Sequence, residues 1–180
     1  MMLKVRKLKA CIYLQFDDGE ENWSYWQCKR TDGLDLIDEW KRRHAGGTFV
    51  DTRSDLLSFN SSGGWPLFGL FSENHMPFED QRDPGTVPSL AEMTKAAIGA
   101  LKGSPQGFFL MVEGARIDMG HHKNWALRAL NETAAFDEAI RQAMAMVDIR
   151  ETLVVVTADH SHNMIFTGYT GNKKRSPLTH

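Results

Sequence analysis

Two continuous apolar runs and the helical pattern between them dominate this sequence. The runs cover residues 108–112 and 153–156, and apolar runs of this length are typical of strands buried on both faces. Between them, apolar residues recur every three or four positions over 126–147, which predicts an amphipathic helix. Its expected inward residues are Ala126, Leu130, Thr133, Phe136, Ile140, Ala143 and Val147. Strand, helix and strand together predict a βαβ crossover with parallel strands.

Shorter elements are predicted before this unit: a helix over 34–43, a strand at 48–50, a helix that starts at 52–55 and a buried strand at 66–71. A loop follows over 72–87. Ser89 and Glu92 then have the spacing of a capping box, in which each side chain satisfies an open backbone amide. This predicts a helix that runs to Lys102, stops at Gly103 and has inward residues Leu90, Met93, Ala97 and Ala100.

Composition and charge restrict the possible organisation and partners. The chain has 180 residues, 42% of them hydrophobic, which is enough for one core and not for two. We expect an irregular N-terminal segment over 1–30 and one α/β domain over 31–180. The formal net charge of −2 gives no electrostatic reason to expect a nucleic-acid partner. Cys11 and Cys28 could form at most one disulfide and lack the spacing of a metal-binding or redox pair.

Acidic and imidazole side chains follow both apolar runs. Asp118 and His122 come after the first run, and their spacing of four places both side chains on one face of a helix. Asp159 and His160 are adjacent just after the second run. Because parallel strands meet with their carboxyl ends at one edge, we expect the two pairs to lie together. Carboxylate with imidazole is the zinc donor set of sites without cysteine.

Other residues of the two stretches have less specific interpretations. Glu113, an oxygen donor directly after its strand, suits a harder cation such as magnesium. Taken alone, Asp118 is also typical of a helix N-terminus, where its charge is favourable, and His122 of a partly exposed histidine. The coincidence of two acid-plus-imidazole pairs at one edge favours the metal site. Two neighbouring metals would stabilise the attacking and leaving oxygens of a phosphoryl or related ester transfer.

The same stretches carry a family resemblance. Residues 108–122 and 156–162 resemble the two metal-binding blocks of the animal-type alkaline phosphatases. Less specific matches cover 29–33, 69–71, 88–90, 92–94 and 167–169. The resemblance implies a three-layer α/β/α fold with a mostly parallel central sheet and the metal site at the carboxyl ends of its strands. Residues 31–180 would then be part of such a domain.

The resemblance also implies roles for individual residues. The magnesium ligand would be Glu113, one zinc would take Asp118 and His122, and the second zinc would take Asp159 and His160. His162 and His121 would lie behind the ligands and orient them. The implied reaction is hydrolysis of phosphate monoesters through a phosphoserine. Members of this family are typically homodimers, extracellular and attached to the membrane by a glycolipid, although neither a signal nor an anchor sequence is visible here.

The sequence departs from the family pattern at several positions. The nucleophilic serine of the family follows an aspartate, and none of the ten serines here does. The histidine that would complete the first zinc site is also not found, so each zinc would have two protein ligands. Ser72 and Val87 stand where a calcium site would need acidic residues, so we expect no calcium. An alternative is therefore a truncated, catalytically inactive fragment that at most binds metal weakly. A third is a related two-metal esterase in which water or Ser161 attacks.

Overall fold

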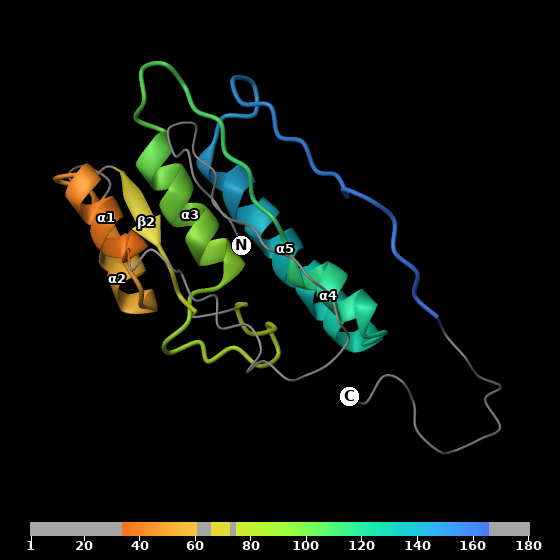
Figure 1. Cartoon of the computed structure of the whole chain (residues 1–180). Helices are drawn as coiled ribbons and strands as arrows, with labels where there is room; N and C mark the ends of the chain where they lie inside the picture. Colours follow the sequence, from red (N-terminus) through yellow and green to blue (C-terminus); the bar gives the residue numbers. More distant parts are fainter. Residues whose placement is uncertain (1–33, 61–65, 73–74, 166–180) are drawn as a thin grey trace, which may run out of the picture.

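The computed structural model describes residues 34–60, 66–72 and 75–165, so the predicted irregular segment 1–30 and both cysteines lie outside the described residues. Its elements, in chain order, are α1 (Leu36–Arg43), β1 (Thr48–Val50), α2 (Arg53–Ser58), β2 (Leu67–Gly69), α3 (Leu90–Leu101), α4 (Arg116–His122) and α5 (Ala126–Met146) (Figure 1). The short helices and strands predicted before residue 72 all form, with ends shifted by a few residues. No helix in the described ranges is both long and apolar enough to cross a membrane.

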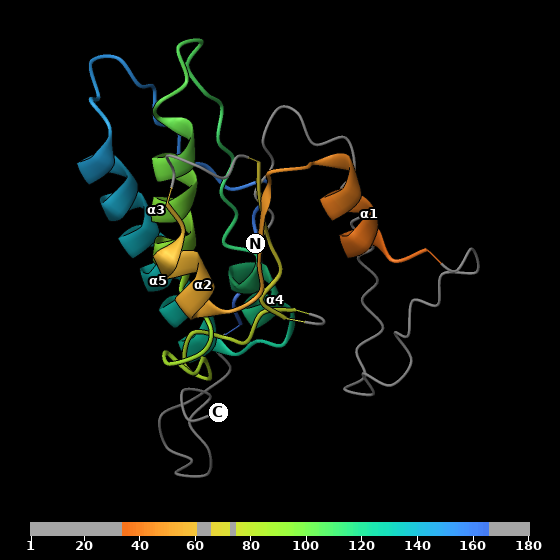
Figure 2. The same cartoon turned by 90° about the vertical axis from the view of Figure 1, so that its left-hand side faces the viewer.

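A small parallel sheet lies between two helical layers. β1 pairs with β2 in register Phe49 to Phe68. On one face, the Phe68 ring packs against Phe49 and against Trp40 of α1, with centroids 5.6 and 5.1 Å apart. On the other face, Val50 packs in the core with residues of α2 and α3. Figure 2 shows α1 on one side of the strands and α2 and α3 on the other. The α/β fold class predicted from sequence is thus present, with one pair of parallel strands.

Helix α3 begins where the sequence predicts. Ser89 Oγ accepts a hydrogen bond from the Glu92 backbone N–H at 3.1 Å, and Glu92 Oε2 accepts one from Ser89 N–H at 2.9 Å. This capping box is joined to α2 because Arg53 also donates to both Glu92 carboxylate oxygens. Met93 and Ala97 are buried as predicted, whereas Leu90 and Ala100 are only half-buried. Thr94 is buried instead and donates to Leu90 O at 2.7 Å.

Helix α5 has the predicted extent, but its buried residues agree with the predicted inward set only at Ala126. Its buried residues are Ala126, Ala129 and Ala139. Small side chains lie here because α5 packs closely against both α3 and α4 (Figure 1). The prediction that Leu130 points inward is wrong, since its side chain is 54% exposed. Hydropathy alone predicted that the larger apolar residues of α5 would be buried. The buried side is instead the one with small residues, because the backbones of α3 and α4 can come close to α5 there.

The predicted strands at 108–112 and 153–156 do not form a ladder within the described residues. Both stretches are extended, and Met111 alone makes an isolated β-type contact. Leu153 is 88% exposed, and the segment around it runs along the outside of the molecule (Figure 1). A strand that is apolar on both sides needs a neighbour on each edge and a layer on each face. The described residues do not supply these, so the central βαβ unit is a wrong prediction, and the parallel pair is β1 and β2.

Candidate metal centre

Helix α4 presents Asp118 and His122 on one face. They lie four residues apart, and His122 Nε2 is 3.3 Å from Asp118 Oδ2. The long helix was predicted from residue 126, and Asp118 and His122 lie before it in a separate helix of seven residues. Their pairing depends only on helical geometry between the two positions, as the sequence predicted.

The extended segment after residue 157 brings two further imidazoles to the same carboxylate. Nε2 of His160 and Nε2 of His162 each lie 3.7 Å from Asp118 Oδ1. Alternate residues of an extended chain point to the same side, which explains why His160 and His162 both reach this oxygen. Asp118 is therefore the point on which three histidines converge.

The hydrogen bonds of the two imidazoles determine which nitrogen is available to a ligand. His160 Nδ1 lies 3.0 Å from Ser161 O, and His162 Nδ1 lies 3.2 Å from Asn163 O. A carbonyl oxygen can only accept, so Nδ1 carries the proton and a neutral ring has its lone pair on Nε2. Metal-bound histidines typically have this arrangement, with the far N–H held by a carbonyl group.

One oxygen of the cluster lacks a partner. Asp118 Oδ1 is buried and accepts no hydrogen bond within the described residues. A buried carboxylate oxygen without a donor is costly, and a cation would relieve that cost. Asp118, His122 and His162 each offer a ligand atom, and these atoms lie within 4.8 Å of one another. Ligands about 2 Å from a tetrahedral zinc are roughly 3.3 Å apart, so the donors fit this ion after a small contraction.

The other predicted ligands lie less centrally. Asp159 is 85% exposed on its side chain, and its Oδ2 lies 3.5 Å from His160 Nε2. Its Oδ1 accepts the His160 backbone N–H at 3.0 Å, which stabilises the local turn. Glu113 is half-buried and is not part of the three-residue group within the described residues. The structure thus brings Asp118, His122 and His160 together, with Asp159 at the edge.

Two histidines expected behind the ligands differ from each other. The His121 ring stacks on His162 with centroids 5.2 Å apart, and its Nδ1 lies 2.8 Å from Ile117 O. This contact agrees with a supporting position. His162, by contrast, lies as close to Asp118 as His160 does, and its ring contacts His122 edge-on at 4.7 Å. The alternation of His160 and His162 in an extended segment is the sequence signal that could have placed both rings on the side of Asp118.

Arg116 fixes the beginning of α4 against the neighbouring loop. Its Nε donates to Met76 O at 2.6 Å, and its guanidinium lies 4.2 Å from the centre of the Phe78 ring. Burial lowers the pKa of Arg116, and the nearby Glu132 carboxylate opposes that effect. Burial likewise raises the pKa of Glu132, whose Oε1 accepts the Glu79 backbone N–H at 2.5 Å. These contacts hold α4 and α5 to the loop before α3.

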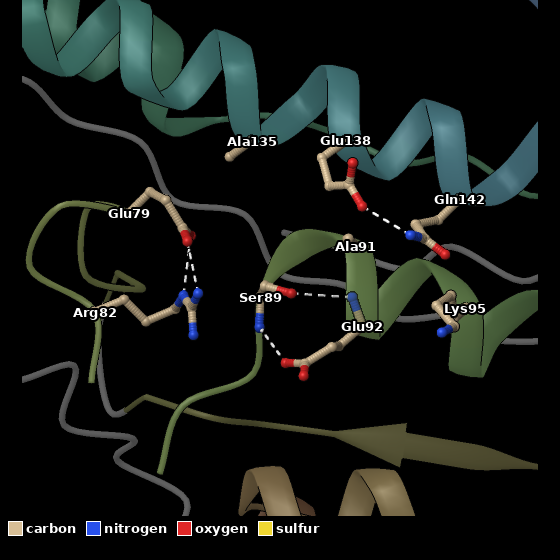
Figure 3. A pocket seen from close by; sticks show the side chains of 9 residues that line it. All are labelled: Glu79, Arg82, Ser89, Ala91, Glu92, Lys95, Ala135, Glu138 and Gln142. Atoms are coloured by element: carbon tan, nitrogen blue, oxygen red, sulfur yellow. Dashed lines mark hydrogen bonds and ion pairs between the residues drawn. The ribbon is translucent and has the colours of Figure 1, made fainter. Parts of the chain in front are cut away.

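A separate hollow of about 280 Å³ lies between the start of α3, the loop before it and α5 (Figure 3). Its lining is Glu79, Arg82, Ser89, Ala91, Glu92, Lys95, Ala135, Glu138 and Gln142. Each lining carboxylate is paired with an arginine: Glu79 with Arg82, Glu92 with Arg53 and Glu138 with Arg141. The carboxylates of this hollow are thus neutralised by arginines of the fold itself.

Comparisons with known proteins agree with the motif at this site. A sequence model described as alkaline phosphatase matches residues 13–179. The tissue-nonspecific alkaline phosphatases of cat and human are 47% and 46% identical over 144 residues, which is 78% of this chain. An alkaline phosphatase of Atlantic cod, Gadus morhua, is 44% identical over 143 residues. The chain spans 28% of the length of the two mammalian relatives and 30% of the fish relative.

Proposed function

Because the chain belongs to the alkaline phosphatase family, we propose that it carries metal-binding residues of a phosphate monoester hydrolase. Zinc is the ion assigned to Asp118, His122 and His162. The resemblance further assigns a second zinc to Asp159 and His160 and a magnesium to Glu113. The observation that supports the proposal is the convergence of three imidazole nitrogens on Asp118: those of His160 and His162 face the unpartnered Oδ1, and that of His122 faces Oδ2.

The donor set favours zinc over the harder cations at this carboxylate. Magnesium prefers six oxygen ligands, several of them water, whereas imidazole nitrogen with a carboxylate oxygen suits zinc. When bound, zinc acts as a Lewis acid and lowers the pKa of a coordinated water. The residues of this chain hold the ion and orient its ligands. The Ser161 and Asn163 carbonyls fix the imidazoles of His160 and His162, and Asp118 supplies negative charge that would partly neutralise the cation.

A second candidate function is metal binding without hydrolysis. It is favoured by the sequence observation that no serine of the 180 residues follows an aspartate, the context in which the family's nucleophile occurs. The two candidates share the metal site and differ in turnover. Metal binding and hydrolysis must therefore be measured separately.

The first experiment measures zinc binding by the chelator-treated chain in competition with a coloured zinc indicator. The variant Asp118→Asn keeps the side-chain shape and removes the charge. The matched control is Asp137→Asn, which removes a carboxylate from an exposed position of α5. We expect the wild type and the control to bind zinc with the same affinity and Asp118→Asn to lose this binding. Equal affinity in all three proteins would refute the site.

The second experiment follows hydrolysis of a chromogenic phosphate monoester at alkaline pH. The chain is assayed after chelation and again after zinc and magnesium are restored. Turnover that returns with metal and is lost in Asp118→Asn supports the hydrolase. A chain that binds zinc and has no turnover supports the second candidate.

A further inference from the structure

We propose that Asn124 is a positioning residue that holds the His160–His162 segment over Asp118. This inference rests on the proposed metal site and adds a residue outside the acid and histidine set. Asn124 lies two positions after His122, the last residue of α4. Its role combines a backbone conformation with a side-chain contact, and the contact can be removed while the backbone conformation is kept.

The backbone of Asn124 ends helix α4 in a left-handed turn. Its φ of 52° is the single positive value of a non-glycine residue in the described ranges. Its N–H donates to His121 O, and the Trp125 N–H donates to Gly120 O, both at 2.8 Å. This pair of bonds is the Schellman motif, in which glycine is the commonest residue at the left-handed position and asparagine the next. The turn directs the Asn124 side chain away from the helix axis.

The side chain of Asn124 pairs with the backbone of Ile165. Nδ2 donates to Ile165 O at 3.1 Å, and Oδ1 accepts Ile165 N–H at 3.2 Å. The carboxamide therefore contacts the extended segment as a neighbouring strand would, with one donor and one acceptor. In the part of the chain that the structure describes, these are the hydrogen bonds that join residues 153–165 to another region.

The position of this contact couples it to the metal site. Ile165 lies three residues beyond His162, and Asn124 lies two beyond His122. Apart from Asn124, the segment meets α4 through its two histidines, at 3.7 Å from Asp118 and by ring contacts to His121 and His122. Without the carboxamide, the segment would lose its hydrogen bonds to the end of α4, and the two imidazoles would be held less firmly over Asp118.

Asparagine combines the left-handed backbone conformation with a side chain that both donates to and accepts from Ile165. Glycine adopts the left-handed turn and has no side chain to pair with Ile165. Aspartate accepts and cannot donate, and alanine does neither while straining the turn. Asn124→Gly therefore removes the contact and keeps the turn. Asn124→Ala removes the contact and disturbs the turn as well.

The experiment compares the full 180-residue wild type with both variants. We expect Asn124→Gly to unfold at the urea midpoint of the wild type and to bind zinc roughly 10-fold more weakly, as on loss of an outer partner of a metal site. Cobalt bound in place of zinc should show an altered visible spectrum. Asn124→Ala should weaken zinc binding similarly and also unfold at a lower urea concentration than the wild type. Unchanged zinc affinity and cobalt spectrum in Asn124→Gly would overturn the inference.

A metal-free measurement separates this inference from the proposed function. Hydrogen exchange at the Ile165 amide should accelerate in metal-free Asn124→Gly because its acceptor has been removed. If exchange is unchanged, the contact does not hold the segment and the inference fails, whatever the zinc result. If the wild type binds no zinc, the proposed site and this role of Asn124 both fail, even where exchange accelerates. If the wild type binds zinc and the variant binds it equally, only the inference fails.

Discussion

Gly120 of α4 lies directly against Ala129 of α5. A Cβ atom on Gly120 would lie 3.0 Å from the Ala129 backbone nitrogen and 3.2 Å from its Cβ. Ala129 is buried, and its backbone has no rotamer by which to move aside. The absence of a side chain at position 120 thus sets the distance between the two helices, and with it the place of Asp118 and His122.

Gly120→Ala is expected to destabilise the chain by about 1–3 kcal/mol, the usual range for overpacking a close contact. The measurement is the free energy of unfolding in urea. The control is Gly99→Ala in α3, where an added Cβ meets nothing within 4 Å. That variant should be more stable by about 0.5–1 kcal/mol because alanine favours the helix. Equal effects of the two substitutions would contradict the close contact.

Glu92 predicts a pH dependence of stability. The Arg53 side chain, with help from Ser89, holds the pKa of Glu92 below its ordinary value of 4.5, against the effect of burial. The folded state then binds fewer protons than the unfolded state. The contribution of this group is full above the ordinary pKa and is lost as pH falls through the lowered folded pKa.

Glu92→Gln keeps a capping side chain and removes this titration. At pH 7 we expect the variant to be less stable by about 1 kcal/mol, the upper end of the range for an ion pair that solvent still reaches. Below pH 4.5 the difference should shrink. Urea unfolding at several pH values checks this, with Asp137→Asn as a carboxylate control. A constant difference from pH 7 to pH 3 would speak against the ion pair.

His162 and His121 are expected to differ in their effect on zinc affinity. His162→Ala removes a proposed ligand, whereas His121→Ala removes a ring that stacks on it. The second change should weaken binding about 10-fold, as for other outer partners, and the first by more. Competition with a zinc indicator gives both constants. The reverse order would show that His121, and not His162, is the direct ligand.

The exposed apolar segment predicts self-association. Leu153 and Val155 are 88% and 72% exposed and alternate along an extended stretch. Such edges pair readily with other chains. The double variant Leu153→Lys with Val155→Lys should lower the scattering mass of the chain at high concentration and leave its unfolding midpoint unchanged. Identical scattering of variant and wild type would exclude this segment as the cause.

Local signals in the sequence predicted local structure well. The capping box of Ser89 and Glu92 and the four-residue spacing of Asp118 and His122 depend on a few neighbouring atoms, and both are present. Long-range packing was harder to predict. The apolar stretch 153–156 is typical of a buried strand, but burial requires neighbours that its own residues cannot specify. Leu130 was misplaced for a related reason, since the buried side of α5 depends on which helices pack against it.

The site was predicted in composition and only partly in arrangement. Asp118, His122 and His160 were expected to lie together because they follow apolar runs. His162 was assigned a supporting position because the family pattern places it there, and the structure brings its Nε2 as close as that of His160. Asn124 was not identified, because a carboxamide in a polar stretch has no chemical signature until its backbone conformation is known.

The convergence on Asp118 also has a topological consequence. His122 and His162 are separated by roughly forty residues, a span that includes all of α5. An ion shared by these two side chains would close that span into a ring in the folded chain. Because the unfolded chain does not hold the two ligands together, the free energy of zinc binding would add to the free energy of folding. Bound zinc would then oppose the unfolding of α5 from both of its ends, although it would contact no residue of that helix.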